Sequence, residues 1–294
     1  MRINRRESIT GLLALPLLAS VLCREARASG TLPLNADTLG VNTHMGQGQP
    51  PAKVAEALRL TGLRHIRDSV LPPSILATLV PAMQGTVRLT AVVGGRRPIK
   101  ALIIALEAIE RKWPGILAAI EGPNEVNNFP FPYKGLSGSP AAVAFQSDLY
   151  AAVRASAPLH HLPVIAFTDL AFQDSASDFF NFHPYPPNGE LLEPRIARMK
   201  ARVAQSSSPT KPIQFTEFGY STSEMNEERQ AALLIAGCRA AVAAGIRRVF
   251  VYQLSDFYPD RDPAHPALGN HYGLFDLHYR PKKAALAIAR ILRP

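Results

Sequence analysis

Two glutamates stand where apolar runs of the sequence become polar. The stretch AAIEGPNEVNNF over 118–129 stops being apolar at a polar segment that ends in Glu125, and PIQFTEFGYST places Glu217 at the end of a second apolar run. Glycoside cleavage needs two facing carboxyl groups: one is protonated to assist the departing sugar oxygen, and the other is ionised to attack the anomeric carbon or activate water. The two glutamates are therefore candidates for that chemistry if the fold brings them together.

The elements that must position these side chains alternate along the chain. From about residue 34, short β-branched or apolar runs are followed by Gly/Pro-rich or polar breaks and then by Ala/Leu-rich stretches with helical spacing. This pattern predicts eight strands: Leu39–His44, Leu63–Asp68, Val87–Val93, Leu117–Glu121, Val164–Thr168, Phe179–His183, Ile213–Phe218 and Val249–Leu254. The clearest predicted helices are Lys53–Leu60, Ile99–Lys112, Ala141–Ala157, Glu193–Ala204, Glu227–Ala244 and Lys282–Leu292.

Eight strand and helix units predict a single α/β domain over residues 29–294, folded as a (β/α)₈ barrel. The alternative is a doubly wound open sheet, which is disfavoured because no predicted strand leads into a G-x-G-x-x-G or phosphate-binding turn. In a (β/α)₈ barrel the active site lies at the carboxyl ends of the strands. Glu125 and Glu217 fall on the fourth and seventh strands, so both are expected at that rim. Trp113 closes a helix at the opposite end and is predicted to pack against the core.

The chain resembles the large clan of retaining glycoside hydrolases built on (β/α)₈ barrels. In that clan an Asn-Glu pair ends strand 4 and a Glu ends strand 7, and here these residues are Asn124-Glu125 and Glu217. The likeness covers about residues 34–292 and is nearest to the cellulase-like and β-xylosidase-like branches. It implies hydrolysis by double displacement, with Glu125 as general acid and base, Glu217 as nucleophile and Asn124 on the sugar 2-hydroxyl.

Further matches lie at the ends of other predicted strands. Arg67 ends strand 2, as does the arginine beneath the nucleophile in the clan, and FHPYP supplies His183-x-Tyr185 after strand 6. Strand 8 departs from the clan, because Tyr252 stands where a Trp usually lies beneath the sugar. His44, at the end of strand 1, is expected to face the sugar. The structural alternatives are an Arg67 that pairs with Asp68 or a helix residue, and a His183 and Tyr185 that only pack.

The resemblance also implies how the acids are tuned. Arg67 and a hydroxyl donated by Tyr185 keep Glu217 ionised, and the charge of Glu217 is expected to raise the pKa of Glu125. Aromatic residues in predicted rim loops are expected to line a groove of sugar subsites: Phe129, Phe131, Tyr133, Tyr220, Phe257, Tyr258 and Tyr272.

The amino terminus predicts an export signal over residues 1–28. Basic residues precede an apolar stretch from Ile9 to Leu22, and Ala26-Arg27-Ala28 is a small-x-small cleavage site. Arg5-Arg6 suggests the twin-arginine route and Ser8 after the pair leaves the Sec route open. Loss of five basic and two acidic residues with the signal lowers the net charge from +9 to +6. Cys238 then has no partner for a disulfide and is predicted to be a buried helix residue.

The composition of the chain limits the classes of partner and cofactor that the protein can be expected to bind. Basic residues are scattered, which disfavours nucleic-acid binding, and a weak attraction to an anionic envelope or polysaccharide is the most that the charge supports. The sequence predicts an exported, cofactor-free monomer, periplasmic or extracellular, without membrane attachment after signal cleavage, that acts on a carbohydrate. A metal site of the amidohydrolase type is disfavoured because the His-x-His motif is missing. The alternative from another class is a carbohydrate-binding or structural barrel that has lost turnover.

Overall fold

The computed structural model describes residues 33–293 apart from 95–96, 130, 170–173 and 258–270. The predicted export signal, 1–28, lies outside the described residues. The chain divides into two units, Met1–Pro33 and Leu34–Pro294, and the second unit carries everything described below.

Eight parallel strands form one sheet in the order β7-β4-β3-β2-β1-β10-β9-β8. Their bounds are β1 Leu39–Asn42, β2 His65–Ser69, β3 Arg88–Val92, β4 Leu117–Glu121, β7 Val164–Ile165, β8 Phe180–Phe182, β9 Ile213–Phe218 and β10 Val249–Val251. The sheet closes between its two edges through a parallel bridge of Ile165 with Phe179, where the Ala166 N–H also donates to the Phe179 carbonyl. The predicted (β/α)₈ barrel is confirmed.

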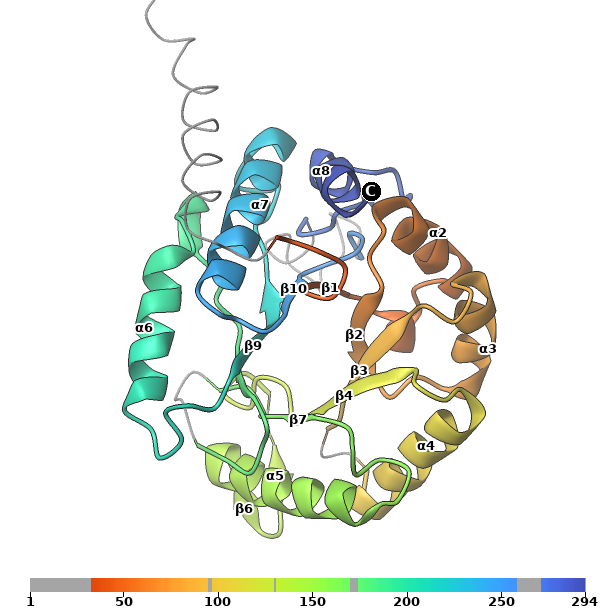
Figure 1. Ribbon diagram of the computed structural model, residues 1–294, viewed down its shortest axis with the longest axis vertical. Coiled ribbons are helices and arrows are strands. Elements are labelled where there is room, and N and C mark those ends of the chain that lie inside the picture. Colours follow the sequence, from red (N-terminus) through yellow and green to blue (C-terminus); the bar gives the residue numbers. More distant parts are fainter. Residues whose placement is uncertain (1–32, 95–96, 130, 170–173, 258–270, 294) are drawn as a thin grey trace, which may run out of the picture. The chain divides into compact units, whose positions relative to one another are not determined.

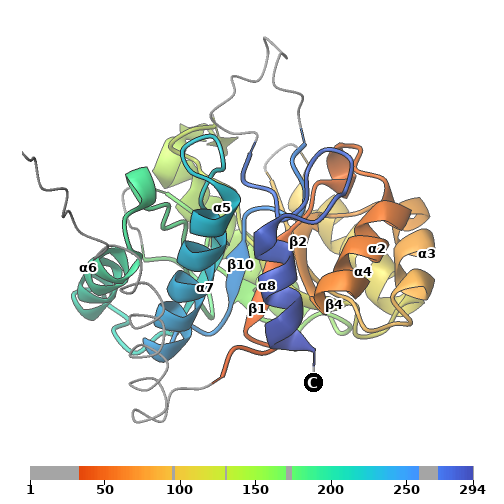
Figure 2. The same ribbon diagram turned by 90° about the horizontal axis from the view of Figure 1, so that it is seen from above.

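Helices surround the strands in a ring (Figure 1). They are α2 Pro51–Thr61, α3 Pro73–Ala82, α4 Ile99–Lys112, α5 Gly138–Ala155, α6 Glu193–Ala204, α7 Glu227–Ala243 and α8 Lys283–Leu292. Helices α7, α8 and α2 lie side by side outside β10 and β1 (Figures 1 and 2). A short hairpin, β5 Pro132–Tyr133 with β6 Leu136–Ser137, and two 3₁₀ turns, η1 Met45–Gln47 and η2 Pro187–Gly189, lie in the connecting segments.

Helix α3 is absent from the clearest sequence predictions because prolines obscure it. Pro73 occupies its first turn, where the missing N–H costs nothing, and Pro81 lies in its last turn. Between β7 and β8 the described residues hold no helix, so this unit departs from the regular alternation.

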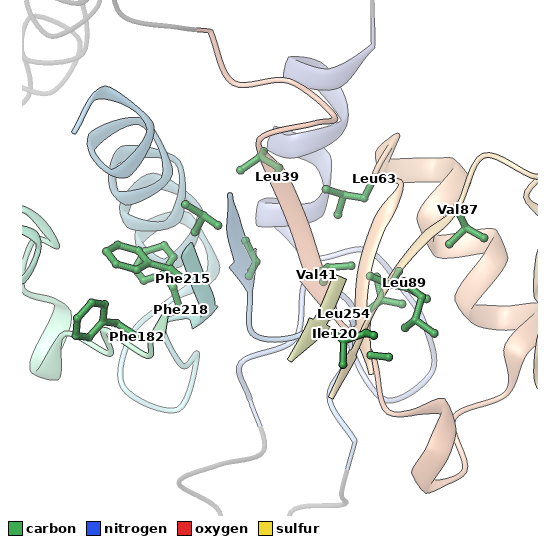
Figure 3. Close-up of a cluster of buried hydrophobic side chains, with 14 of the residues drawn as sticks. Leu39, Val41, Leu63, Val87, Leu89, Ile120, Phe182, Phe215, Phe218 and Leu254 are labelled. Carbon is green, nitrogen blue, oxygen red and sulfur yellow. The ribbon is translucent and has the colours of Figure 1, made fainter. Parts of the chain in front are cut away.

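The core lies between the strands and the surrounding helices. Leu39 and Val41 of β1 and Phe215 of β9 are fully buried, and Figure 3 shows them among aliphatic side chains of the neighbouring strands. Trp113 follows α4 and packs partly buried against this core, as predicted. Cys238 of α7 is buried, and burial raises the pKa of its thiol to about 12, which agrees with an inert structural cysteine.

The pairing of neighbouring strands places their inward-facing side chains in rows across the sheet. Residues His65 and Arg88 are cross-strand neighbours in one row near the amino ends of β2 and β3. Two positions further along, Asn42 and Arg67 are neighbours in the next row. Since alternate residues of a strand share a face, His65 and Arg67 face the same side of the sheet, one near each end of the barrel. No helix among the described residues has the length and apolar character needed to span a bilayer.

Candidate active site

Arg67 is the hub of a polar cluster inside the carboxyl end of the barrel. Its Nε and Nη2 donate to the two oxygens of Glu121, each at 2.7 Å, in a bidentate pair. Its Nη1 donates to Glu217 Oε1 at 2.6 Å and to Asn42 Oδ1 at 2.9 Å, and Nη2 also donates to Asn124 Oδ1 at 2.7 Å. All five N–H groups of the guanidinium therefore donate to acceptors from β1, from β4 and its following loop, and from β9.

The charge of Arg67 is held by two carboxylates. Burial, at 6% exposure, lowers the pKa of the guanidinium, but the charges of Glu121 and Glu217 raise it more, so the net shift is upward. The alternative pairing with Asp68 does not form, because the Asp68 carboxylate accepts from the Thr43 hydroxyl and from backbone N–H groups that include Met45. Burial raises the pKa of Asp68 to about 6.

Glu217 lies within β9 and is 7% exposed. Besides the bond from Arg67, its Oε2 accepts a hydrogen bond of 2.6 Å from the Tyr185 hydroxyl. Burial and the charge of Glu217 raise the pKa of Tyr185, so the phenol keeps its proton and donates. Hydrogen bonds from Arg67 and Tyr185 thus hold both oxygens of the carboxylate that the sequence assigns to the attacking residue.

Glu125 lies in the loop after β4, four residues beyond Glu121, where the strand ends as predicted. Its backbone has φ 43°, in the left-handed region that non-glycine residues rarely adopt. The Glu125 N–H donates to Thr168 Oγ1 at 2.8 Å, and the Asn128 amide donates to Glu125 Oε2 at 3.0 Å. Glu125 Oε1 lies 2.8 Å from His183 Nδ1. The loop is therefore fixed in a strained conformation that aims the side chain at β8, which is common at functional sites.

The pKa of Glu125 is shifted opposite to expectation. Burial raises it, but the hydrogen bond and charge of His183, the hydrogen bond from Asn128 and the charge of Arg67 outweigh burial, so the net shift is downward. The expectation of a raised pKa is wrong for the free protein, because the hydrogen bonds and positive charges around the carboxyl group together outweigh its burial.

A chain of hydrogen bonds sets the proton on His183. Thr216 Oγ1 lies 3.0 Å from Glu121 Oε1 and 2.8 Å from Asn181 Oδ1, and both are acceptors. The single hydroxyl hydrogen goes to one of them, so His183 Nε2, at 2.9 Å, must donate to Thr216. His183 Nδ1 then shares one proton with Glu125 across 2.8 Å, held by the imidazole or by the carboxyl group. The site thus stores a proton on the predicted acid or on its neighbour.

Glu125, Glu217 and His183 meet at one point. One ligand atom from each lies within 4.8 Å of the others, and His183 Nδ1 is 3.7 Å from Glu217 Oε2. By residue type these three side chains are also the set among the described residues that could hold a metal ion. A metal would have to displace the proton between His183 and Glu125 and compete with Arg67 for Glu217.

Aromatic rings line one side of this cluster. His44 follows β1 and stacks on Phe257 at 5.4 Å, with its edge 5.6 Å from Tyr252. Tyr252 follows β10 and packs against Tyr185 at 6.0 Å and Tyr272 at 5.8 Å. Burial lowers the pKa of His44 to about 4, so its ring is neutral, and its Nδ1 has no hydrogen-bond partner among the described residues. The structure therefore brings His44 and Tyr252 to the site as predicted.

Two of the aromatic residues expected to line sugar subsites pack instead in the interior. Phe131 is 7% exposed and packs against Phe145, and Tyr220 is 2% exposed. Tyr133 also packs against Phe145 of α5, and the Tyr220 hydroxyl donates to the Glu190 carbonyl. Phe129 is 57% exposed, and Tyr258 lies outside the described residues.

Sequence reasoning missed four members of the cluster. Asn42, Glu121, Asn181 and Thr216 are buried side chains that complete the bonds of Arg67 and His183. Asn42, Glu121 and Asn181 are each the single polar residue of a strand, and Thr216 lies between the polar Gln214 and Glu217 of β9; such polar residues in buried strands are the signal that could have revealed them. A buried polar group must find a partner, so several such residues on neighbouring strands predict a network.

Comparison with known proteins shows the fold. No family model and no curated protein sequence matches the chain. A family 39 glycoside hydrolase from the gut symbiont Bacteroides cellulosilyticus WH2 has a TM-score of 0.64 at 15% identity, covering 88% of this chain and 64% of its own. A family 2 β-galacturonidase from Eisenbergiella tayi scores 0.66 at 17% identity, covering 86% of this chain and 50% of its own. A family 39 β-xylosidase from Caulobacter crescentus scores 0.66 at 17% identity, covering 87% and 71%. The chain thus spans about half to two thirds of the first two structures, and glycoside hydrolase barrels are its structural neighbours.

Proposed function

We propose that the protein is a retaining β-glycoside hydrolase that cleaves O-glycosidic bonds of a poly- or oligosaccharide. The observation that carries the proposal is the approach of Glu125 and Glu217, with one oxygen of each within 4.8 Å of the other. Retaining enzymes hold their carboxyl groups about 5–5.5 Å apart, whereas inverting enzymes need about 6.5–9.5 Å to admit water. The separation supports double displacement.

The surroundings of the two carboxyl groups support different roles. Glu217, oriented by hydrogen bonds from Arg67 and Tyr185, attacks the anomeric carbon and forms a glycosyl–enzyme ester. Glu125 gives the glycosidic oxygen the proton that it shares with His183, and the aglycone leaves. Glu125 then takes a proton from water, which attacks the same carbon and releases Glu217. Asn124, fixed by Arg67, lies beside the nucleophile as a partner for the 2-hydroxyl.

The charge of the site favours an uncharged sugar next to the nucleophile. Among the described residues, Arg67 has no free N–H, His44 is neutral and the buried Lys282 pairs with Asp256 at 2.7 Å. Three carboxyl groups, Glu121, Glu125 and Glu217, face that one guanidinium. A uronate would bring a further negative charge against unpaired carboxylate charge, which costs several kcal/mol when desolvated. A neutral pentose or hexose is therefore the proposed glycone.

Chromogenic aryl β-glycosides test both parts of the proposal. The wild type should release aryl alcohol from a neutral β-glycoside at least about 100-fold faster than from the matching β-glucuronide. Glu217→Ala should lose at least about 10³-fold of the rate, and azide should restore turnover with inverted product. Glu125→Ala should chiefly slow substrates with poor leaving groups, and azide should then give retained product.

Each failure has a distinct meaning. Azide giving the same anomer with both variants would reverse or remove the assigned roles. A faster glucuronide would overturn the neutral glycone while leaving the reaction intact. Glycan binding that persists without hydrolysis would support the alternative, a carbohydrate-binding or structural barrel. We also propose that the protein acts as an exported monomer, periplasmic or extracellular, on glycans of the envelope or surroundings.

A further inference from the structure

The amino end of the barrel carries a row of basic residues at the starts of three strands, β10, β2 and β3. Arg247 and Arg248 immediately precede β10, His65 opens β2 directly after Arg64, and Arg88 opens β3. Strands β10, β1, β2 and β3 are consecutive neighbours in the sheet, and β1 between them starts close to Asp37. We call these five basic residues the amino-end cluster. It lies at the end of the strands opposite the candidate active site.

The arginines of this cluster lack carboxylate partners. None of the four forms an ion pair with a carboxylate of the described residues. Arg88 donates to the carbonyls of Gly85 and Val87, and Arg248 donates to the Asp37 carbonyl. Arg64 and Arg247 are exposed.

The surroundings of Arg248 and His65 show that positive charge is crowded at this end of the barrel. Burial lowers the pKa of Arg248 to about 10, assisted by the charge of Arg247. His65 is 7% exposed, and its Nδ1 has no hydrogen-bond partner among the described residues. The nearest acid is Asp37, whose carboxylate is 84% exposed and 3.9 Å from His65 Nε2. One exposed carboxylate does not balance four guanidinium groups, so an anion would lower the free energy of this end of the barrel.

We propose that the amino-end cluster binds oxyanion groups of an anionic polysaccharide. Guanidinium groups match carboxylate, sulfate and phosphate in a bidentate manner, and the buried imidazole adds a directional site. A membrane fits less well, because none of the exposed large apolar residues is at these strand starts; they are Ile104, Phe129, Leu136, Leu191, Leu277 and Leu286. A polymer held at the amino end leaves the opposite mouth open. The surface is independent of the reaction proposed above, and neither needs the other to be correct.

Binding of dextran sulfate to the purified protein tests the proposal, with unsulfated dextran of equal size as the neutral control. Arg64→Gln/Arg247→Gln removes two exposed cluster arginines. The matched control, Arg198→Gln/Arg239→Gln, removes two exposed arginines of α6 and α7 and gives the same net charge. At low ionic strength, calorimetry should show that the cluster variant binds dextran sulfate about 10-fold more weakly and the control less than about 2-fold more weakly. Unchanged thermal unfolding in both variants verifies folding.

Four outcomes overturn the proposal. Equal weakening in both variants would mean that only net charge attracts the polymer. Absence of wild-type binding to dextran sulfate, or unchanged binding by the cluster variant, would remove the site. Tighter binding to phosphatidylglycerol vesicles than to dextran sulfate would assign the surface to a membrane. Hydrolysis of a small aryl glycoside should be the same in the wild type and the cluster variant, which separates this surface from the candidate active site.

Discussion

Arginines at the two ends of the barrel show how one residue type is used in two ways. At the carboxyl end, Arg67 donates all five N–H groups to carboxylates and amides, and its pKa is raised. At the amino end, Arg248 is half-buried beside Arg247 without a carboxylate partner, and its pKa is lowered to about 10. The first guanidinium is part of a preorganised network, whereas the second is exposed to uncompensated repulsion.

The difference lies in which side chain accompanies each strand end. Polar residues that terminate β4 and β9 supply anions to one mouth, while the starts of β2, β3 and β10 supply cations to the other. The stability of the fold therefore depends on the ion pairs of Arg67 at the carboxyl end. The basic residues at the amino end remain able to bind an anionic partner.

The largest expected effect comes from the same substitution at the two ends. Arg67→Met leaves Glu121, which is 0% exposed, without its counter-charge, and breaking such a buried pair typically costs about 3–5 kcal/mol of the free energy of unfolding. Activity should also fall by at least about 10³-fold, because Glu217 and Asn124 lose their common donor. Arg248→Met should change stability by less than about 1 kcal/mol.

Urea unfolding of both variants at neutral pH measures these differences. The double variant Arg67→Met/Glu121→Gln should recover part of the lost stability without recovering activity, because the uncompensated charge is gone. Equal stability loss at the two ends would break the comparison.

The next effect concerns His65 at the amino end. Burial, assisted by Arg248, lowers its pKa to about 3, against about 6.5 in the unfolded chain. Between about pH 6.5 and pH 3, the imidazole is therefore protonated in the unfolded state and neutral in the folded state. The free energy of unfolding falls as pH is lowered through this range, by up to about 1.4 kcal/mol per pH unit. His65→Gln should flatten this loss between neutral pH and pH 4.

Chemical denaturation across that pH range provides the measurement. His161→Gln, an exposed histidine, is the matched control and should leave the slope unchanged. His44, whose pKa is also lowered by burial, to about 4, and carboxyl groups with a lowered pKa such as Glu125 contribute to the slope that remains. If the free energy of unfolding changes with pH equally in the wild type and in His65→Gln, then the neutral, buried His65 does not contribute to the pH dependence of stability.

The smallest expected effect is a shift in a pH profile. The bond from His183 lowers the pKa of Glu125, so the proposed acid is protonated mainly in acidic solution. His183→Asn removes that cause, and burial should then raise the pKa of Glu125. The alkaline limb of kcat/KM for a neutral aryl glycoside should move to higher pH. A lower rate with an unmoved limb would limit His183 to packing.

The sequence predicts the fold well because parallel strands buried on both faces read as apolar runs. The bounds of β4 and β9 match the prediction, while predicted strands such as Val164–Thr168 extend beyond β7, because the polar ends leave the sheet while remaining buried. Helix α3, with prolines at both ends, and the segment between β7 and β8, which holds no helix among its described residues, depart from the spacing that the sequence pattern uses.

The residues of the candidate active site likewise fall into those that the sequence predicts and those that it does not. Loop and strand-end residues such as Asn124 and His183 belong to short motifs that can be recognised without coordinates. Glu121 and Thr216 are polar residues inside buried strands, and their partners Arg67 and His183 lie 54 and 33 positions away in the chain. Register and barrel closure, which no local pattern encodes, bring these pairs together. The downward pKa shift of Glu125 follows from such a contact and was unpredictable for the same reason.

Closure of the barrel has a consequence for local unfolding. Strand β7 has two residues, and it meets the β8 side through the Ile165–Phe179 bridge, with Gln146 of α5 donating across to the Ile165 and Ala176 carbonyls. A seam with so few cross-strand bonds opens at lower free energy than the long ladders of β2 and β3, so its amides are expected to exchange with solvent first. Because Asn181 reaches across it to Glu121, opening the seam would also loosen the support beneath Arg67.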